Sequence, residues 1–165
     1  MSRTALKTET LAVARAKRAE ADEKVPPTVM GMDPGAHTGV ALYRGGTLVA
    51  LETITPREIA AKLADVMPAR LVFEDSRLES FVWTSASSKA AALKMARNVG
   101  QIDAWCTLIT EICADLGIPC HGISPKAKGA KVAAEAFGRI TGWEGRTNGH
   151  ERDAAMVAWK YRGAR

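Results

Sequence analysis

The sequence predicts an α/β protein in which helices flank a mixed five-stranded sheet. Short apolar runs with tight turns between residues 28 and 53 predict a meander of three strands. Two further apolar segments, residues 70–74 and 118–123, each follow a helical pattern. A meander pairs its strands antiparallel, whereas a strand–helix–strand crossover makes them parallel, so the sheet should contain both pairings.

The three strands of the meander are expected at residues 28–32, 38–43 and 47–53. Asp33-Pro34-Gly35 ends the first strand with a turn signal, and Arg44-Gly45-Gly46 joins the second strand to the third. The first strand should be parallel to the strands at 70–74 and 118–123, because helices separate them along the chain.

Four helices are expected between and after these strands. The first has Thr55 as N-cap, Pro56 at its first position and Glu58 completing a capping box, and it runs to about Met67, where Pro68 stops it. A long helix over residues 85–116 carries a buried stripe and is ended by Gly117. Residues 126–137 and 150–161 should form two more helices, joined by a glycine-rich loop at 138–149. The stripe consists of Leu93, Ala96, Val99, Ile102, Cys106, Ile109 and Cys113.

The length of 165 residues fits one packed domain, which we place at residues 28–165. Residues 1–27 form a charged arm, either a helical or disordered solvated tail or a basic segment that touches DNA or a partner subunit. The chain has no apolar run long enough to span a membrane and no secretory signal, so we expect a cytoplasmic protein with no membrane partner. The net charge of +5 favours polyanionic partners such as nucleic acid.

The three cysteines have no disulfide or zinc pattern, because their number is odd and no CxxC pair occurs. Cys106 and Cys113 lie two turns apart on the long helix, so we expect them to face the core as small apolar groups.

Acidic side chains stand where catalysis by a metal ion would need them. Asp33 ends the first strand, and Glu74 ends the otherwise apolar strand at 70–74. Parallel neighbours would bring both to one edge of the sheet, the edge where ligands bind in open α/β sheets. His150 and Asp153 are three residues apart and therefore share a face of the last helix, whose alanines would let it lie close to the sheet.

Clustered carboxylates repel one another, and a divalent cation removes that repulsion. Carboxylate oxygens suit Mg²⁺, or Mn²⁺ in its place, and two such ions about 4 Å apart can hydrolyse a phosphodiester. Each acid also has a structural explanation when taken alone: a turn for Asp33, a strand end for Glu74 and a helix dipole for Asp153. Only the three acids taken together, in this order on the predicted sheet, point to a nuclease.

These residues resemble the motifs of the RuvC-type Holliday-junction resolvases. Residues 30–35 with 38–41 resemble the first hairpin of that family, and Glu74 matches its second acid. The stretch from Gly117 to Lys131 is similar to its fifth strand and lysine-bearing helix. His150 and Asp153 match its last pair of metal ligands. The resemblance covers about residues 28–161 and implies an RNase H-like fold.

The resemblance also implies a homodimer that cuts branched DNA, a four-way junction, by paired symmetric nicks. It implies two Mg²⁺ ions held by Asp33, Glu74 and Asp153, with His150 as a fourth ligand or a general acid/base. Lys131, with Lys126 and Lys128, would contact phosphates.

Three features depart from the family pattern. The turn after Asp33 and the lysine loop are shorter, and residues 75–83 replace a short apolar step. Compact variants of this kind look like phage or prophage forms. In the segment after Glu74, Phe81 and Trp83 would stack on bases or hold the loop to the long helix, and Arg77 would face DNA or solvent.

Three other functions stay open: an RNA-processing nuclease of the same superfamily, a small actin-like ATP-binding domain, and a non-catalytic binding module. The ATP-binding folds start with a similar strand and turn but usually need two domains. The complete set of acids argues against a module without catalysis.

Overall fold

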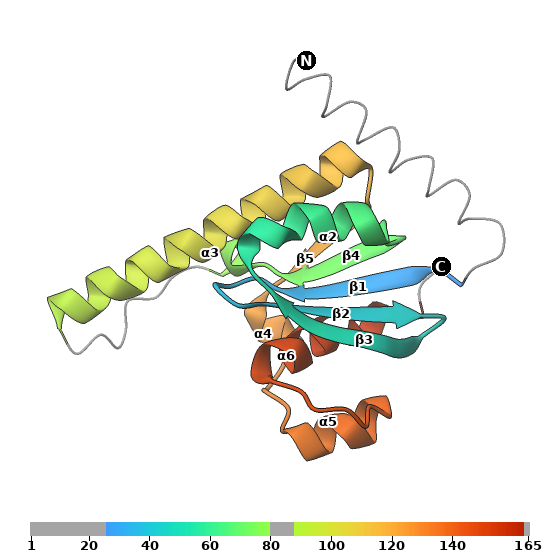
Figure 1. The fold of residues 1–165 in the computed structure, drawn as a ribbon. Coiled ribbons are helices and arrows are strands. Elements are labelled where there is room, and N and C mark those ends of the chain that lie inside the picture. Colours follow the sequence, from blue (N-terminus) through green and yellow to red (C-terminus); the bar gives the residue numbers. More distant parts are fainter. Residues whose placement is uncertain (1–25, 80–87, 164–165) are drawn as a thin grey trace.

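The structure is a computed structural model, and it describes residues 26–79 and 88–163. Its sheet has the order β3-β2-β1-β4-β5 (Figure 1). The strands are β1 (Thr28–Asp33), β2 (Thr38–Arg44), β3 (Thr47–Ile54), β4 (Arg70–Glu74) and β5 (Cys120–Ile123). The meander is antiparallel, whereas β4 pairs parallel with both β1 and β5. The predicted five-stranded mixed sheet is therefore confirmed, with β5 beginning two residues later than expected.

Each face of the sheet has its own hydrophobic core, and the alternation of side chains along the strands decides which residue enters which core. One face holds Met30, Met32, Leu71 and Phe73 under helices α2 (Ile59–Val66) and α3 (Lys89–Leu116). The other face packs against α5 (Ala134–Thr141) and α6 (Gly149–Ala158), and it includes Val29 and Val72 with the alanines of α6. The sheet is thus covered on both sides.

The first helical segment begins and ends where the sequence predicts. A short 3₁₀ turn, η1 (Pro56–Glu58), leads into α2, and the Glu58 carboxylate accepts hydrogen bonds from the backbone N (2.8 Å) and Oγ1 (2.5 Å) of Thr55. Met67 adopts a left-handed conformation with φ of 44° and ends the helix before Pro68.

The long helix α3 is confirmed, but its stripe is only partly buried. Ser88 caps the start of the helix by accepting from Ala91 N at 3.2 Å, and residues 85–87 lie outside the described residues. Cys106 and Cys113 are buried free thiols, as predicted, and Gly117 ends the helix with φ of 68°. Leu93 is 52% exposed, because the N-terminal half of α3 extends beyond the sheet (Figure 1).

The prediction of one helix over residues 126–137 is wrong, because the structure has two shorter helices there. The four-residue α4 (Pro125–Lys128) stops at Gly129, whose φ of 88° leaves the helical region. Helix α5 begins only at Ala134 and runs to Thr141, past the expected start of the loop at Gly138. Lys131 therefore lies in an irregular segment between the two helices.

The last helix, α6, is confirmed and continues into a 3₁₀ turn, η3 (Trp159–Tyr161). Among the described helices, none combines the length and apolarity needed to cross a membrane. The predicted arm at residues 1–27 lies outside the described part of the chain, apart from Pro26 and Pro27.

Candidate active site

Asp33 and Glu74 are brought together by the sheet itself. The register between β1 and β4 pairs Met32 with Phe73, so the next residue of each strand ends at the same edge. Val29 and Val72 face the core under α6, and side chains alternate between faces, so Asp33 and Glu74 share that face with them. The two predicted acids therefore point to the α6 side of the sheet.

Helix α6 lies unusually close to the sheet because β1 and β2 carry glycines beneath it. A Cβ at Gly31 would be 2.1 Å from the carbonyl oxygen of Ala154. A Cβ at Gly39 would be 2.0 Å from the carbonyl oxygen of His150. Real Cβ atoms essentially never come within 3.0 Å of another heavy atom in this way. The two glycines therefore set the depth at which α6 carries His150 and Asp153 over the strand ends.

The start of α6 is also held from the side by β3. Asn148 caps the helix by accepting from Glu151 N at 3.0 Å, and Glu151 accepts in return from Asn148 N at 2.9 Å. Thr53 of β3 donates to Glu151 Oε1 at 3.2 Å and accepts from Asn148 Nδ2 at 2.8 Å. This cap fixes the helix start, and with it the position of His150.

All four predicted catalytic residues line one pocket with a volume of about 370 Å³. His150 Nδ1 lies 3.0 Å from Asp33 Oδ2, and Lys131 Nζ lies 3.7 Å from Asp153 Oδ2. Besides the four predicted catalytic residues and Lys131, the lining residues are Pro34, Gly35, Ala36, Ser76 and Ile102. Residues far apart in the sequence thus meet as three carboxylates, one imidazole and one ammonium group.

The donor atoms of this pocket are of the chemical type that a hard divalent cation binds. Carboxylate oxygens are the ligands that Mg²⁺ and Mn²⁺ prefer, and an open pocket leaves room for phosphate oxygens and water. Within residues 26–79 and 88–163, however, no three His, Cys, Asp or Glu side chains are already drawn together as ligands of one ion. Asp33 and Asp153 instead lie beside the nitrogen atoms of His150 and Lys131.

Of the three predicted phosphate contacts, the structure brings Lys131 into the pocket, where its side chain is 84% exposed. Lys126 lies outside the pocket and forms an ion pair with Glu79, which also accepts a short hydrogen bond from Ser124. The side chain of Lys128 and the residues Phe81 and Trp83 lie outside the described residues.

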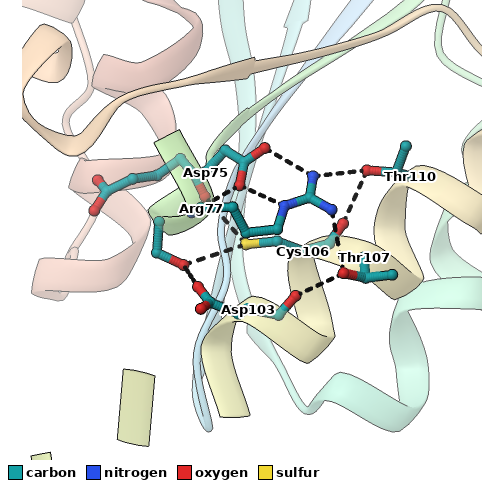
Figure 2. Close-up of polar contacts among 8 residues, drawn as sticks. Asp75, Arg77, Asp103, Cys106, Thr107 and Thr110 are labelled. Carbon is teal, nitrogen blue, oxygen red and sulfur yellow. Dashed lines mark hydrogen bonds and ion pairs between the residues drawn. The ribbon is translucent and has the colours of Figure 1, made fainter. Parts of the chain in front are cut away.

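Arg77 lies next to the pocket but turns its guanidinium toward the protein (Figure 2). It forms a two-pronged ion pair with Asp75 and contacts Thr107 and Thr110 of α3. The hydrogen bonds from Arg77 hold the pKa of Asp75 below its usual value, and the same pair raises the pKa of Arg77. The contacts of Arg77 with Asp75 and α3 leave its side chain 32% exposed, and the contact with DNA stays a prediction.

Sequence reasoning missed two residues that shape the site. Ser76 lines the pocket, and its Oγ donates to Asp103 Oδ1 at 2.6 Å. Arg152, beside Asp153 in α6, donates from Nε to Val132 O at 2.9 Å and from Nη1 to Thr147 O at 3.2 Å. Arg152 thereby ties the segment that carries Lys131 to the helix that carries Asp153. A helix-surface arginine gives no sign of such a role in sequence alone.

Comparisons with known proteins identify the fold. The chain is similar to RuvC from Thermus thermophilus in complex with a Holliday junction substrate, with a TM-score of 0.56 and 17% identity over 81% of this chain and 90% of that one. A second Thermus thermophilus RuvC structure gives a TM-score of 0.54 and 16% identity over 80% and 91%. No protein-family model and no curated protein matches the chain. The chain therefore has the RNase H-like fold of RuvC.

Proposed function

We propose that this protein is a metal-dependent endonuclease that cuts DNA at branched structures, in particular four-way junctions. The observation that carries the proposal is the pocket in which Asp33, Glu74, Asp153 and His150 meet beside Lys131. The fold adds support, since a similar chain is RuvC in complex with a Holliday junction substrate. The net charge of +5 suits a polyanionic substrate.

Each ionisable residue of the pocket has a role in this proposal. The three carboxylates would hold two Mg²⁺ ions, or Mn²⁺ in their place, whose charge offsets that of the carboxylates and of the phosphate under attack. Lys131 is exposed and reaches Asp153, so its ammonium group can bind a phosphate oxygen at the mouth of the pocket. His150 either completes the ligand set or moves a proton, and its contact with Asp33 Oδ2 orients the ring for both roles.

Symmetric cutting of a junction needs two active sites, so we propose that the protein acts as a homodimer making paired nicks. Lys126 and Lys128 lie in the segment that leads to Lys131 and would add phosphate contacts along the bound strand. Phe81 and Trp83 would stack on unpaired bases at the branch point.

A cleavage assay tests the proposal directly. A synthetic four-way junction, a linear duplex and a structured RNA are incubated with the protein in Mg²⁺, in Mn²⁺ or with a chelator. We expect paired nicks in the junction alone, with both metals and not with chelator. Preferential cutting of the RNA would instead favour an RNA-processing nuclease, and thermal stabilisation by ATP would favour the ATP-binding alternative.

Substitutions that keep the shape of the side chain identify the residues responsible. Asp33→Asn, Glu74→Gln and Asp153→Asn should each abolish cleavage and leave metal-free junction binding intact. The matched control is Asp65→Asn, which changes an exposed acid of α2 outside the pocket and should cut like the wild type. If the Asp33, Glu74 and Asp153 variants cut at the control rate, the proposed active site is refuted.

A further inference from the structure

The chain that leaves β4 is fastened to α3 by four contacts, which come from Glu74, Ser76 and Arg77. Cys106 Sγ lies 3.7 Å from Glu74 O, and Ser76 Oγ donates to Asp103 Oδ1 at 2.6 Å. Arg77 then donates from Nη1 to Thr107 Oγ1 at 3.2 Å and from Nη2 to Thr110 Oγ1 at 3.1 Å (Figure 2). The four α3 positions, 103, 106, 107 and 110, follow the i, i+3, i+4, i+7 spacing of one helix face.

Asp75 is the centre of this attachment. Its Oδ1 accepts from Arg77 Nε at 2.8 Å and from Arg77 N at 3.1 Å, and its Oδ2 accepts from Arg77 Nη2 at 2.8 Å. Its backbone N donates to Ile123 O of β5 at 2.8 Å. The carboxylate lies where Gly122 of β5 lacks a side chain, since a Cβ there would be 2.7 Å from Asp75 Oδ2. Asp75 is therefore held from two sides, by Arg77 and by β5.

Alternation along the strand links this attachment to the pocket. Asp75 projects to the α3 side with Leu71 and Phe73, whereas Glu74 projects to the α6 side with Val72. Because the two residues are adjacent, the backbone that Asp75 and Arg77 hold is the backbone that aims Glu74. Ser76, which lies between Asp75 and Arg77, lines the pocket as well.

We propose that Arg77 is a positioning residue: paired with Asp75 and anchored on α3, it fixes where the side chains of Glu74 and Ser76 lie in the pocket, and it makes no contact with substrate. This inference rests on the proposed nuclease function, since it assigns a role within that site. It replaces the DNA contact that the sequence suggested for Arg77.

The hydrogen bonds of Arg77 favour positioning over phosphate binding. A guanidinium has five N–H groups, and four of them, one on Nε, one on Nη1 and two on Nη2, already donate to Asp75, Thr107 and Thr110. Both threonine hydroxyls donate to carbonyl oxygens of their own helix, so their lone pairs are turned toward Arg77. A phosphate bound in the two-pronged position of Asp75 would have to break a charge-assisted pair with a buried carboxylate.

Three variants separate the two roles. Arg77→Lys keeps the charge but loses the planar fork, Arg77→Met loses both, and Arg57→Met is the control on an exposed arginine of η1. Two readouts are the single-turnover rate of junction cleavage and the metal-free Kd for the junction over a range of salt concentrations. The third is the Mn²⁺ midpoint, the Mn²⁺ concentration at which the rise in Tm is half complete.

A positioning role predicts that Arg77→Lys and Arg77→Met both lose about 10–10²-fold in cleavage rate, since small misplacements of reacting groups cost that much. Both variants should need a higher Mn²⁺ concentration to reach half of the maximal thermal stabilisation. Both should bind the junction with the Kd and the salt dependence of the wild type. A phosphate contact predicts the opposite: Arg77→Lys cuts normally, while Arg77→Met binds weakly and its salt slope falls by about 0.9. That second result would overturn the inference.

The design also separates failure of this inference from failure of the proposed function. If the wild type cuts junctions and Arg77→Lys cuts equally well, the positioning role fails and the nuclease stands. If the wild type never cuts, the nuclease proposal fails, and an unchanged Mn²⁺ midpoint in Arg77→Lys would still overturn the positioning role. Should Arg77→Met not fold, Thr110→Val removes one acceptor alone, and a wild-type cleavage rate in that variant would count against the inference.

Discussion

Replacing Gly39 with alanine should damage the active site through the backbone of α6. The new Cβ would lie 2.0 Å from the carbonyl oxygen of His150 and 2.3 Å from its carbonyl carbon. Since real Cβ contacts stay beyond 3.0 Å, the helix start must move by at least about 1 Å, or β2 must yield by the same amount. A displacement of this size carries His150 away from Asp33, at a cost of about 10²-fold in cleavage rate.

The same overlap should cost stability. Forcing an extra carbon into a well-packed contact destabilises a domain by about 1–3 kcal/mol, and for a chain of this size each kcal/mol lowers Tm by about 2–4 °C. Gly100→Ala is the matched control, because Gly100 lies in α3 with nothing within 4 Å of its added Cβ, and it should keep or raise Tm. Calorimetry and single-turnover cleavage measure both effects. If Gly39→Ala matched the control in both assays, the close packing of α6 on β2 would not control the site.

Three other predictions follow from single contacts. Burial raises the pKa of Tyr43, whose hydroxyl donates to Ala155 O, so stability should fall as pH rises above about 10, and Tyr43→Phe should remove that fall in alkaline unfolding curves. Arg77 lowers the pKa of Asp75, so stability is lost as pH drops below about 3.8, and acid unfolding of Asp75→Asn should lose that dependence. Arg152→Met should free the Lys131 segment, speed amide hydrogen exchange at residues 131–133 and reduce cleavage without changing the exchange of β4.

Most of the sheet could be predicted because its signals are local. Turn residues such as Gly45 and Gly46 and the alternation of apolar residues decide where strands begin, end and face. Asp33 and Glu74 were identified because each interrupts an apolar pattern at a strand end, and strand pairing brings such ends together without help from other residues. The capping boxes at Thr55 and Asn148 are equally local, although only the first was recognised from sequence.

The errors came from contacts between distant segments. Periodicity identified the face of α3 that would be buried but not how far the sheet extends beneath it, so Leu93 was expected in the core. The break between α4 and α5 follows from Gly129 and is maintained by Arg152, more than twenty residues later, which holds Val132 O. The two threonine contacts of Arg77 could not be read from the sequence for the same reason, because they lie some thirty residues further along the chain.

The end of β4 explains how a site of this kind tolerates an unusual connecting segment. Glu74 and Asp75 are neighbours that face opposite sides of the sheet, so one can serve the pocket while the other anchors the chain. The Asp75–Arg77 pair holds the strand end by hydrogen bonds to α3. Hydrogen bonds fix direction more strictly than apolar contacts do. In the positioning role that we propose for Arg77, the charged segment after Glu74 aims this carboxylate through hydrogen bonds to α3.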